Sequence, residues 1–415
     1  MTARRLFLWC FVPIALALAC CVAMFFIAKA VLAPLPGEWS APLRMGPARL
    51  EAGVPTMLRL ATAPWAGPLL HGRSVATRSG RLHFAWLAHS QTLALHCAPC
   101  SLRVPSLGGE PLLLEELRLS VRRTGNMLEG DIASGPLRAT WQGRLDHSGM
   151  RLRMDLPMSP IADGYVLFAA GVPELARARI EGRFALMVQL SLPDGSLTVA
   201  PQIEGFQVSG LGTAGLAGAR SSCSPSRRAS RLATDGWLAQ AVIAAEDQRF
   251  YEHPGFDLRE LSASLSRNQR EGRIERGAST LSQQLAKLLV TGDERSPARK
   301  LRELLYAVEM EQALGKQRIL MLYLQHAPWG DGLCGAEAAA QHYFGVRAHE
   351  LTPGQAAWLA AMLHNPAMEA GQWLESGQIN LVRTRHIVLQ LRGMPRQQRE
   401  RLATTLDQLP WTRRP

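Results

Sequence analysis

Two glutamates and a cluster of cations are the residues best suited to do chemistry together. Glu246 lies in the acidic stretch "AAEDQRFYEHPGFD" (244–257), and Glu303 follows Arg299 and Lys300 in "ARKLRELLYAVEMEQAL" (298–314). A carboxylate beside a hydroxyl can act as a general base, typically contributing about 10²–10⁴ in rate. Clustered Lys and Arg side chains can hold a phosphate or pyrophosphate leaving group. The combination favours glycosyl transfer from a sugar diphosphate over glycoside hydrolysis, which uses two carboxylates and needs no cationic cluster.

Lysine usage points to the same block. The chain has only Lys29, Lys287, Lys300 and Lys316, although Lys and Arg together number 46. Three of these four lysines lie between residues 287 and 316. An ammonium group is a compact charge on a flexible stem, whereas the guanidinium of arginine is a planar fork. The pattern therefore indicates that a small, mobile cation is useful there.

The segments that carry these side chains have helical periodicity. If the helix in "DGWLAQAVIAAEDQRFYEH" (235–253) continues to its end, it places Glu246, Phe250 and His253 on one face. Thr280 and Gln284 share the same spacing with Lys287, and further helices are expected over 298–314, 316–325 and 352–365. The alternative for each helix taken singly is an ordinary amphipathic helix whose polar side chains simply face solvent. The chain after about residue 232 is therefore predicted to be mostly α.

The preceding half has a different pattern. Between residues 36 and 218, short alternating segments such as "GRLHFAWL", "LRATWQGRL" and "MRLRMDL" are separated by turn residues, which is typical of β-strands. Arg151 and Arg153 alternate with apolar residues, so a sheet with one solvated face is expected. This segment resembles the lipid-facing β-sheet modules of AsmA-type envelope proteins. The polar stretch 218–236 is interpreted as a linker or surface loop. The fold class predicted is α+β multidomain, with residues 36–218 as a β-rich domain and 219–410 as a helical domain.

The N-terminus contains an apolar run. "LFLWCFVPIALALACCVAMFFIA" (6–28) carries no charge and is long enough to cross a hydrocarbon core about 30 Å thick. A cleaved signal peptide is the alternative, kept open by "ALALA". Arg4 and Arg5 precede the run, so residues 1–33 are predicted to be a cytoplasmic stub and a membrane helix, with everything after about residue 33 outside the cytoplasm.

Charge and cysteines limit the partners. The net charge of +12 is spread along the chain rather than concentrated in one tract, which favours an anionic surface or ligand and argues against nucleic acid. Four cysteines lie outside the apolar run, and they allow three pairings. Cys97 and Cys100 in "HCAPC" are expected to form a local disulfide rather than a zinc half-site, because a second CxxC is absent. By elimination, Cys223 would pair with Cys334.

The helical half resembles the peptidoglycan glycosyltransferases of family 51, found as monofunctional transglycosylases and in bifunctional penicillin-binding proteins. The resemblance covers about residues 232–368 and rests on five motifs in the family's order. They are "EDQRFYEHPGFD" (246–257), "GASTLSQQLAK" (277–287), "RKLRELLYAVEME" (299–311), "KQRILMLYLQHAPWG" (316–330) with "GAEAAAQHYFG" (335–345), and "LTPGQAAWLAAMLHNP" (351–366). It implies a lysozyme-like α fold and polymerisation of lipid II with release of undecaprenyl pyrophosphate.

The resemblance also implies roles for individual residues. Glu246 would be the general base, and Glu303 the second essential carboxylate, which orients the neighbouring cations or a divalent metal such as Mg or Mn. No tightly bound cofactor is expected. The residues implied in substrate binding are Asp247, Phe250, His253, Ser279, Thr280, Gln284, Lys287, Arg299 and Lys300.

Some positions depart from the family pattern. Leu288 and Gln325 occupy positions that usually hold Asn, Gln355 one that usually holds Glu, and Ala278 replaces the second glycine of a Gly-Gly pair. Both carboxylates and the motif cations are retained, so activity is expected at an uncertain rate. The SxxK, SxN and KTG motifs of a transpeptidase are absent, so a separate transpeptidase is an expected partner. The alternatives are an inactive scaffold that binds lipid II and a lysozyme-like hydrolase. The expected location is the bacterial inner membrane, with a single membrane helix and the bulk of the chain in the periplasm.

Overall fold

The computed structural model describes residues 30–45, 48–102, 112–169, 171–218, 232–271, 279–294, 296–330, 332–409 and 411. The described chain divides into two compact units. The first comprises 30–102, 112–159 and 185–202, and the second comprises 160–184 and 203–411. Each is described by itself below.

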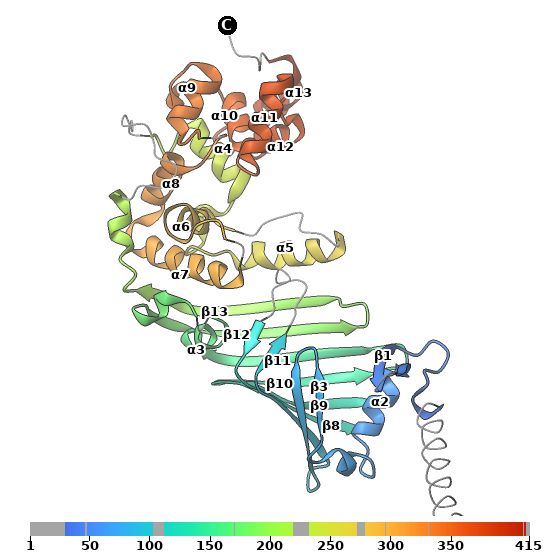
Figure 1. The fold of residues 1–415 in the computed structure, drawn as a ribbon. Coiled ribbons are helices and arrows are strands. Elements are labelled where there is room, and N and C mark those ends of the chain that lie inside the picture. The colour runs from blue at the N-terminus through green and yellow to red at the C-terminus, as the bar shows by residue number, and fades with distance from the viewer. Residues whose placement is uncertain are drawn as a thin grey trace, which may run out of the picture. The chain divides into compact units, whose positions relative to one another are not determined.

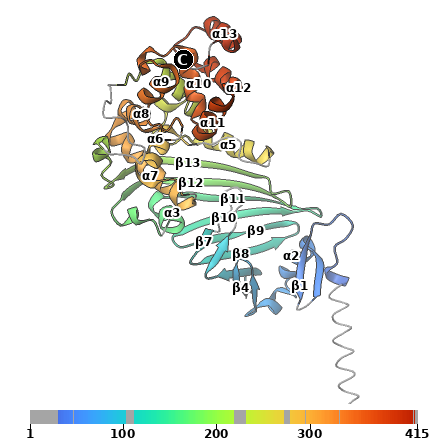
Figure 2. The same cartoon turned by 45° about the horizontal axis from the view of Figure 1, so that its top comes forward.

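A nine-stranded sheet dominates the first half of the chain (Figure 1, Figure 2). Its strands, in spatial order, are β13 (Leu197–Ser209), β12 (Arg179–Leu192), β11 (Met150–Pro160), β10 (Leu137–Leu145), β9 (Met127–Ser134), β8 (Leu117–Thr124), β5 (Thr92–Cys97), β4 (Gly80–Leu87) and β3 (Ser74–Thr77). Two small antiparallel pairs accompany it: β1 (Ser40–Met45) with β2 (Ala48–Gly53), and β6 (Cys100–Leu102) with β7 (Leu112–Leu114).

The register of this sheet explains its alternating sequence. Trp141 pairs with Met154 and Gly143 with Leu152, whereas the intervening Gln142 pairs with Arg153. Because successive side chains point to opposite faces, one face is apolar and the other carries charge. Arg151 and Arg153 are 70% and 56% exposed and pair with Asp146 and Asp155. The solvated face expected from the alternation is confirmed.

Helix α2 (Val54–Ala61) covers part of the apolar face. Leu58 packs there against a small core of Val121, Leu128 and Leu145. In the described part of the first half, further short helices are η1 (Gly67–Leu70), α3 (Ile161–Phe168), η3 (Pro173–Ala176) and η4 (Thr213–Gly218). The predicted Cys97–Cys100 disulfide is present, with Cα atoms 5.6 Å apart. The predicted Cys223–Cys334 pair involves Cys223, which lies outside the described residues.

The second half is helical, as its periodicity predicts. Its elements are α4 (Trp237–Glu246), η5 (Phe250–Glu252), α5 (Leu258–Glu271), α6 (Leu281–Ala286), the π-helical turn η6 (Lys287–Thr291), α7 (Pro297–Ala313), α8 (Gly315–His326), α9 (Ala336–Phe344), η7 (Ala348–Glu350), α10 (Pro353–Met362), α11 (Pro366–Ser376), α12 (Leu381–Gln390), α13 (Arg396–Thr405) and η8 (Leu406–Gln408). Helix α10 packs against α4 and α12 at the centre (Figure 1). Trp329, Trp358 and Phe250 are among the largest fully buried side chains of this core.

The compact units do not follow the boundary expected at 218/219. Residues 160–184 and 203–218 belong to the same unit as the helices. The reason is hydrophobic: Tyr165, Phe206 and Val208 are buried in the same core as α4 and α7. Aromatic contact joins the segments directly, because the ring centroids of Phe206 and Phe256 are 5.7 Å apart.

Within the described ranges, no helix is both long enough and apolar enough to cross a membrane. The predicted membrane helix at 6–28 lies outside those ranges.

Candidate functional site

Glu246 is the last residue of α4. Asp247 follows with φ −160° and ψ 72°, outside the helical region, and the chain then turns through the short helix η5. The prediction of one helix through Glu246, Phe250 and His253 is therefore wrong. The helix ends because the Asp247 carboxylate accepts a hydrogen bond from the backbone N–H of Leu281 at 2.9 Å, a contact made outside α4.

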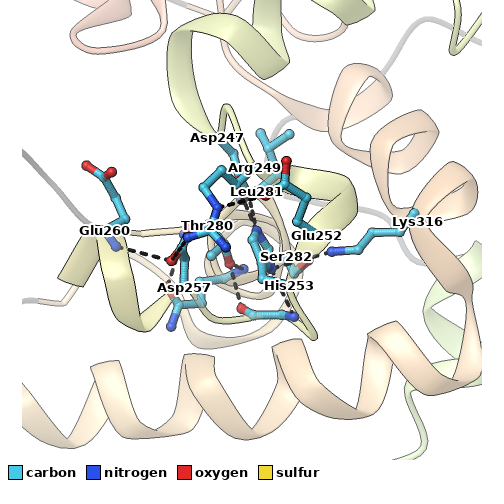
Figure 3. A network of polar contacts seen from close by, with 12 residues as sticks. Asp247, Arg249, Glu252, His253, Asp257, Glu260, Thr280, Leu281, Ser282 and Lys316 are labelled. Atoms are coloured by element: carbon cyan, nitrogen blue, oxygen red, sulfur yellow. Dashed lines mark hydrogen bonds and ion pairs between the residues drawn. The ribbon is translucent and has the colours of Figure 1, made fainter. Parts of the chain in front are cut away.

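Asp247 and His253 form a buried pair behind this helix end (Figure 3). Nε2 of His253 lies 2.9 and 3.0 Å from the two carboxylate oxygens of Asp247. The backbone N–H of Gly255 donates to Nδ1 of His253, so the ring proton is on Nε2 and is donated to Asp247. Phe250 is fully buried beside them. These three predicted substrate-binding residues stabilise the loop that follows Glu246.

Thr280 links this loop to the next helix. Its hydroxyl donates to the carbonyl of Gly255 at 2.7 Å and accepts from the N–H of Gln283, which caps α6. Gly255 has φ +96°, and a Cβ there would lie 3.0 Å from the carbonyl oxygen of Ala307, so a glycine suits this position. Thr280 is 2% exposed, and its hydroxyl forms hydrogen bonds with backbone groups.

Lys316 packs against the same loop (Figure 3). Its ammonium group donates to Glu311 at 2.8 Å and lies 4.4 Å from the centroid of the Phe250 ring. Glu311 also accepts from the hydroxyl of Ser282 on α6. One lysine of the predicted lysine-rich block is therefore explained by packing inside the domain.

The carboxylate of Glu246 is held by two donors. Nε2 of Gln284 donates to Oε2 at 3.0 Å, and Nη2 of Arg383 donates to Oε1 at 3.0 Å. The hydroxyl of Tyr323 donates to Oε1 of Gln284 at 2.8 Å, which orients the amide. Burial, helped by the Glu246 charge, raises the pKa of Tyr323 well above its usual value, so the hydroxyl keeps its proton. Glu246 is thus oriented, and its side chain is 13% exposed.

Arg383 is a site residue that sequence reasoning did not find. It lies on α12, 137 residues after Glu246 and beyond the motifs that support the family resemblance. The stretch "LVRTRHIVLQ" reads as an ordinary amphipathic helix. Only the packing of α12 in the tertiary structure brings its guanidinium to Glu246.

A second charged cluster lies at the start of α7. The carboxylate of Glu303 is 1% exposed and accepts from Arg299 and from Nζ of Lys300, the latter at 2.6 Å. Lys300 also donates to the hydroxyl of Ser279 at 2.6 Å. Ser296 caps the helix, which places Arg299 and Lys300 in its first turns. The N-terminus of a helix carries positive partial charge, so two cations there favour binding of an anion.

Lys300 is poised to respond to such an anion. Partial desolvation of its ammonium group, together with repulsion from Arg299 and Lys287, lowers the pKa of Lys300 to about 8. The side chain as a whole is 48% exposed, so the ammonium group can reach solvent. A bound phosphate would favour its charged form.

Lys287 follows the last residue of α6 in helical backbone conformation. It begins the π-helical turn η6, and its ammonium group pairs with Asp293 at 2.7 Å. That contact lowers the pKa of Asp293. Lys287 is 41% exposed and still contributes positive charge near Lys300.

The described residues contain no group of three or more His, Cys, Asp and Glu side chains arranged to hold a metal ion. Both carboxylate oxygens of Glu303 accept hydrogen bonds from cations, one from Arg299 and the other from Lys300. The divalent cation expected for Glu303 stays an untested prediction, and the cations of this cluster supply positive charge without it.

Two of the departures from the family pattern have structural explanations. Gln355 accepts from the N–H of Thr352 at 2.9 Å in the capping box of α10, a task that an amide oxygen performs as a carboxylate would. Leu288 packs against the hydrophobic core. Gln325 is half-buried on α8. None of the three contacts Glu246 or Glu303 in the hydrogen bonds of the described residues.

Comparison with known proteins identifies the domain that contains these residues. The family model described as "Transglycosylase" matches residues 226–390. Proteins named biosynthetic peptidoglycan transglycosylase from Ectopseudomonas mendocina and Nitrosomonas eutropha are 54% and 46% identical over 129 residues, covering 31% of this chain and 53% of each relative. One from Laribacter hongkongensis is 47% identical over 129 residues, which are 31% of this chain and 57% of that relative.

The chain thus spans about half the length of the curated relatives it matches. The match includes Glu246, Gln284, Glu303 and Arg383, the residues that form the two clusters described above. Residues 226–390 of this chain are a domain of the transglycosylase family.

Proposed function

We propose that this protein is a peptidoglycan glycosyltransferase that polymerises lipid II into glycan strands. The observation that carries the proposal is the carboxylate of Glu246, oriented by Arg383 and Gln284 in a transglycosylase domain. The cationic cluster of Arg299 and Lys300 suits the pyrophosphate of a lipid-linked sugar.

In the proposed reaction, Glu246 accepts the proton of the 4-hydroxyl on the acceptor sugar of lipid II. The hydroxyl oxygen attacks the anomeric carbon of the growing strand, and the bond from that carbon to the pyrophosphate breaks with inversion. Undecaprenyl pyrophosphate leaves, and its developing charge is stabilised by Arg299 and Lys300. The proton on Glu246 then returns to solvent, which restores the base.

We further propose a location at the bacterial inner membrane. The apolar stretch at 6–28 is long enough for a membrane helix, and a lipid-linked substrate requires a site close to the bilayer. The bulk of the chain would lie in the periplasm. The β-rich segment would act as a spacer, a partner-binding module or a lipid-contacting module, and a separate transpeptidase would cross-link the product.

Polymerisation of fluorescent lipid II tests the proposal. The full-length protein is solubilised in detergent, incubated with lipid II, and its products are resolved on a gel by glycan length. A ladder of strands supports a transferase. Retained lipid II binding without a ladder supports the scaffold alternative, and cleavage of preformed strands into fragments supports a hydrolase. Either of these two results contradicts the proposal.

Removal of Arg383 is expected to slow this reaction. In Arg383→Ala, Glu246 loses a charge-assisted hydrogen bond worth about 1.5–3 kcal/mol, so we expect kcat/KM to fall by about 10- to 100-fold. Steady-state rates of lipid II consumption measure the effect. Arg399→Ala is the control, since Arg399 is a partly exposed arginine on α13 that donates to a backbone carbonyl. Equal rates for the two variants would contradict a positioning role for Arg383.

Lys300 is expected to give the reaction an alkaline limit. Its pKa of about 8 means that the free enzyme carries this charge below pH 8 and loses it as the pH rises through that value. Because kcat/KM reports groups of the free enzyme, it should fall above about pH 8. In Lys300→Arg, the cation stays charged, so the decline should move to higher pH. A pH profile of kcat/KM for both proteins measures this. If kcat/KM declines at the same pH in both proteins, Lys300 is not the group responsible for the decline.

A further inference from the structure

Helix α7 carries a second polar stripe besides the one formed by Arg299, Lys300 and Glu303. Arg302, Tyr306 and Glu309 are spaced i, i+4 and i+7, so they share another face of the helix. None of them belongs to the proposed chemistry. Their partners lie at residues 174–177 and 211–212, which precede the matched transglycosylase domain but belong to the same compact unit.

The first contact is an ion pair with Glu174 of η3. Nε of Arg302 lies 2.9 Å from each carboxylate oxygen of Glu174, and Nη2 lies 2.6 Å from Oε1. The hydroxyl of Tyr306 donates to the same carboxylate at 3.3 Å and accepts from Arg177 at 3.0 Å. Burial opposes ionisation of Glu174, but these hydrogen bonds outweigh it and lower the pKa of Glu174. A buried carboxylate is therefore fully paired on α7.

The second contact lies almost two turns further along α7. The carboxylate of Glu309, 9% exposed, accepts from the backbone N–H groups of Leu211 at 3.0 Å and Gly212 at 3.3 Å. These two N–H groups follow the end of β13, where Gly210 has φ +95°. A Cβ on Gly210 would lie 2.4 Å from the carbonyl oxygen of Arg177, so this loop lies directly against the end of η3.

Apolar and backbone contacts join the same segments. The hydroxyl of Tyr165 on α3 donates to the carbonyl of Leu301 at 3.2 Å, one residue before Arg302. Tyr165, Val172 and Leu211 are buried in the core that also contains Leu305 and Val308 of α7. Two charged contacts and a shared core therefore restrain both the rotation and the sliding of α7 along its axis.

We propose that residues 160–184 and 203–218 form a brace for α7, and that Glu174 and Glu309 are positioning residues for the pyrophosphate-binding cluster. The inference rests on the proposed function. Arg302 is adjacent to Glu303, and a helix moves as a rigid element, so a shift at the brace displaces Arg299 and Lys300 with it. Displacement of a substrate-positioning group by about 1 Å can reduce the rate by about 10²-fold. The catalytic unit of this chain therefore begins near residue 160.

Steady-state kinetics of full-length Glu174→Gln and Glu309→Gln test this. We expect KM for lipid II to rise by about 10-fold, and the decline of kcat/KM attributed to Lys300 to shift in pH, because the distance between Lys300 and its neighbours changes. Glu400→Gln is the matched control, since Glu400 forms an exposed ion pair with Arg396 on α13. A role confined to folding would lower the melting temperature and leave KM and the pH profile unchanged.

A double-mutant cycle makes the test specific. If Glu174 acts through Arg302, the effects of Glu174→Gln and Arg302→Gln on KM should be less than additive in the double variant. Where Glu174→Gln does not fold, Arg177→Gln replaces it, because Arg177 is exposed and reaches the pair through Tyr306. Wild-type KM and pH profile in folded variants, or strictly additive effects, would overturn the brace.

Failure of the proposed function is distinguishable from failure of the brace. If the wild type makes no polymer, the affinity for inorganic pyrophosphate, measured by calorimetry, replaces KM. Weaker pyrophosphate binding in Glu174→Gln than in Glu400→Gln would then support the brace without transferase activity. Equal affinities would overturn it.

Discussion

Replacement of Glu246 by glutamine is expected to reduce the rate of glycan polymerisation by about 10²- to 10⁴-fold, the usual contribution of a general base. Glutamine has nearly the same shape but cannot accept the proton. Its NH₂ group also faces a donor, since Arg383 and Gln284 each donate to one carboxylate oxygen. The initial rate of fluorescent lipid II consumption measures the effect.

Two comparisons make this result interpretable. Glu400→Gln, an exposed substitution of the same kind on α13, should keep the wild-type rate. Lipid II binding by Glu246→Gln should stay close to that of the wild type, because the α7 cations that we propose to bind pyrophosphate are unchanged. A Glu246→Gln variant that retains more than about a tenth of the wild-type rate would exclude Glu246 as the base.

Replacement of Glu303 by glutamine is expected to affect both stability and substrate binding. Removal of one partner from a buried ion pair costs about 3–5 kcal/mol, and we expect about 3 kcal/mol of unfolding free energy here because Lys300 is half exposed. Arg299 and Lys300 would be left without their buried counter-charge at the positive end of α7. Urea denaturation measures the loss of stability.

Added anion distinguishes this explanation from a general packing defect. Millimolar pyrophosphate should raise the melting temperature of Glu303→Gln more than that of the wild type, because it supplies the missing negative charge. The same anion should affect Glu400→Gln and the wild type equally. If pyrophosphate stabilises all three proteins alike, the role assigned to Glu303 is incorrect.

Periodicity alone predicted much of the fold. Alternation in segments such as "LRATWQGRL" corresponds to β10, and the helix expected over 352–365 corresponds to α10, which Thr352 caps. These features depend on neighbours in the chain, through side-chain direction and capping. The helix expected through His253 failed because a competing contact, from Leu281 to Asp247, comes from residues 34 positions away. Helix propensity depends on the residues of the segment itself and cannot predict a hydrogen bond to a distant residue.

The sequence by itself determined which residues are candidates for chemistry, namely the two glutamates and the cations beside Glu303, and it contains the motifs of a transglycosylase domain. These residues could be recognised from the sequence because each group lies within a short segment of the chain. Only the tertiary structure decided which side chains face the site. It buried Asp247, Phe250 and His253 behind the loop, brought Arg383 to Glu246, and placed Glu174 against α7. These contacts join residues more than a hundred positions apart or depend on burial, and both arise from packing of the whole core.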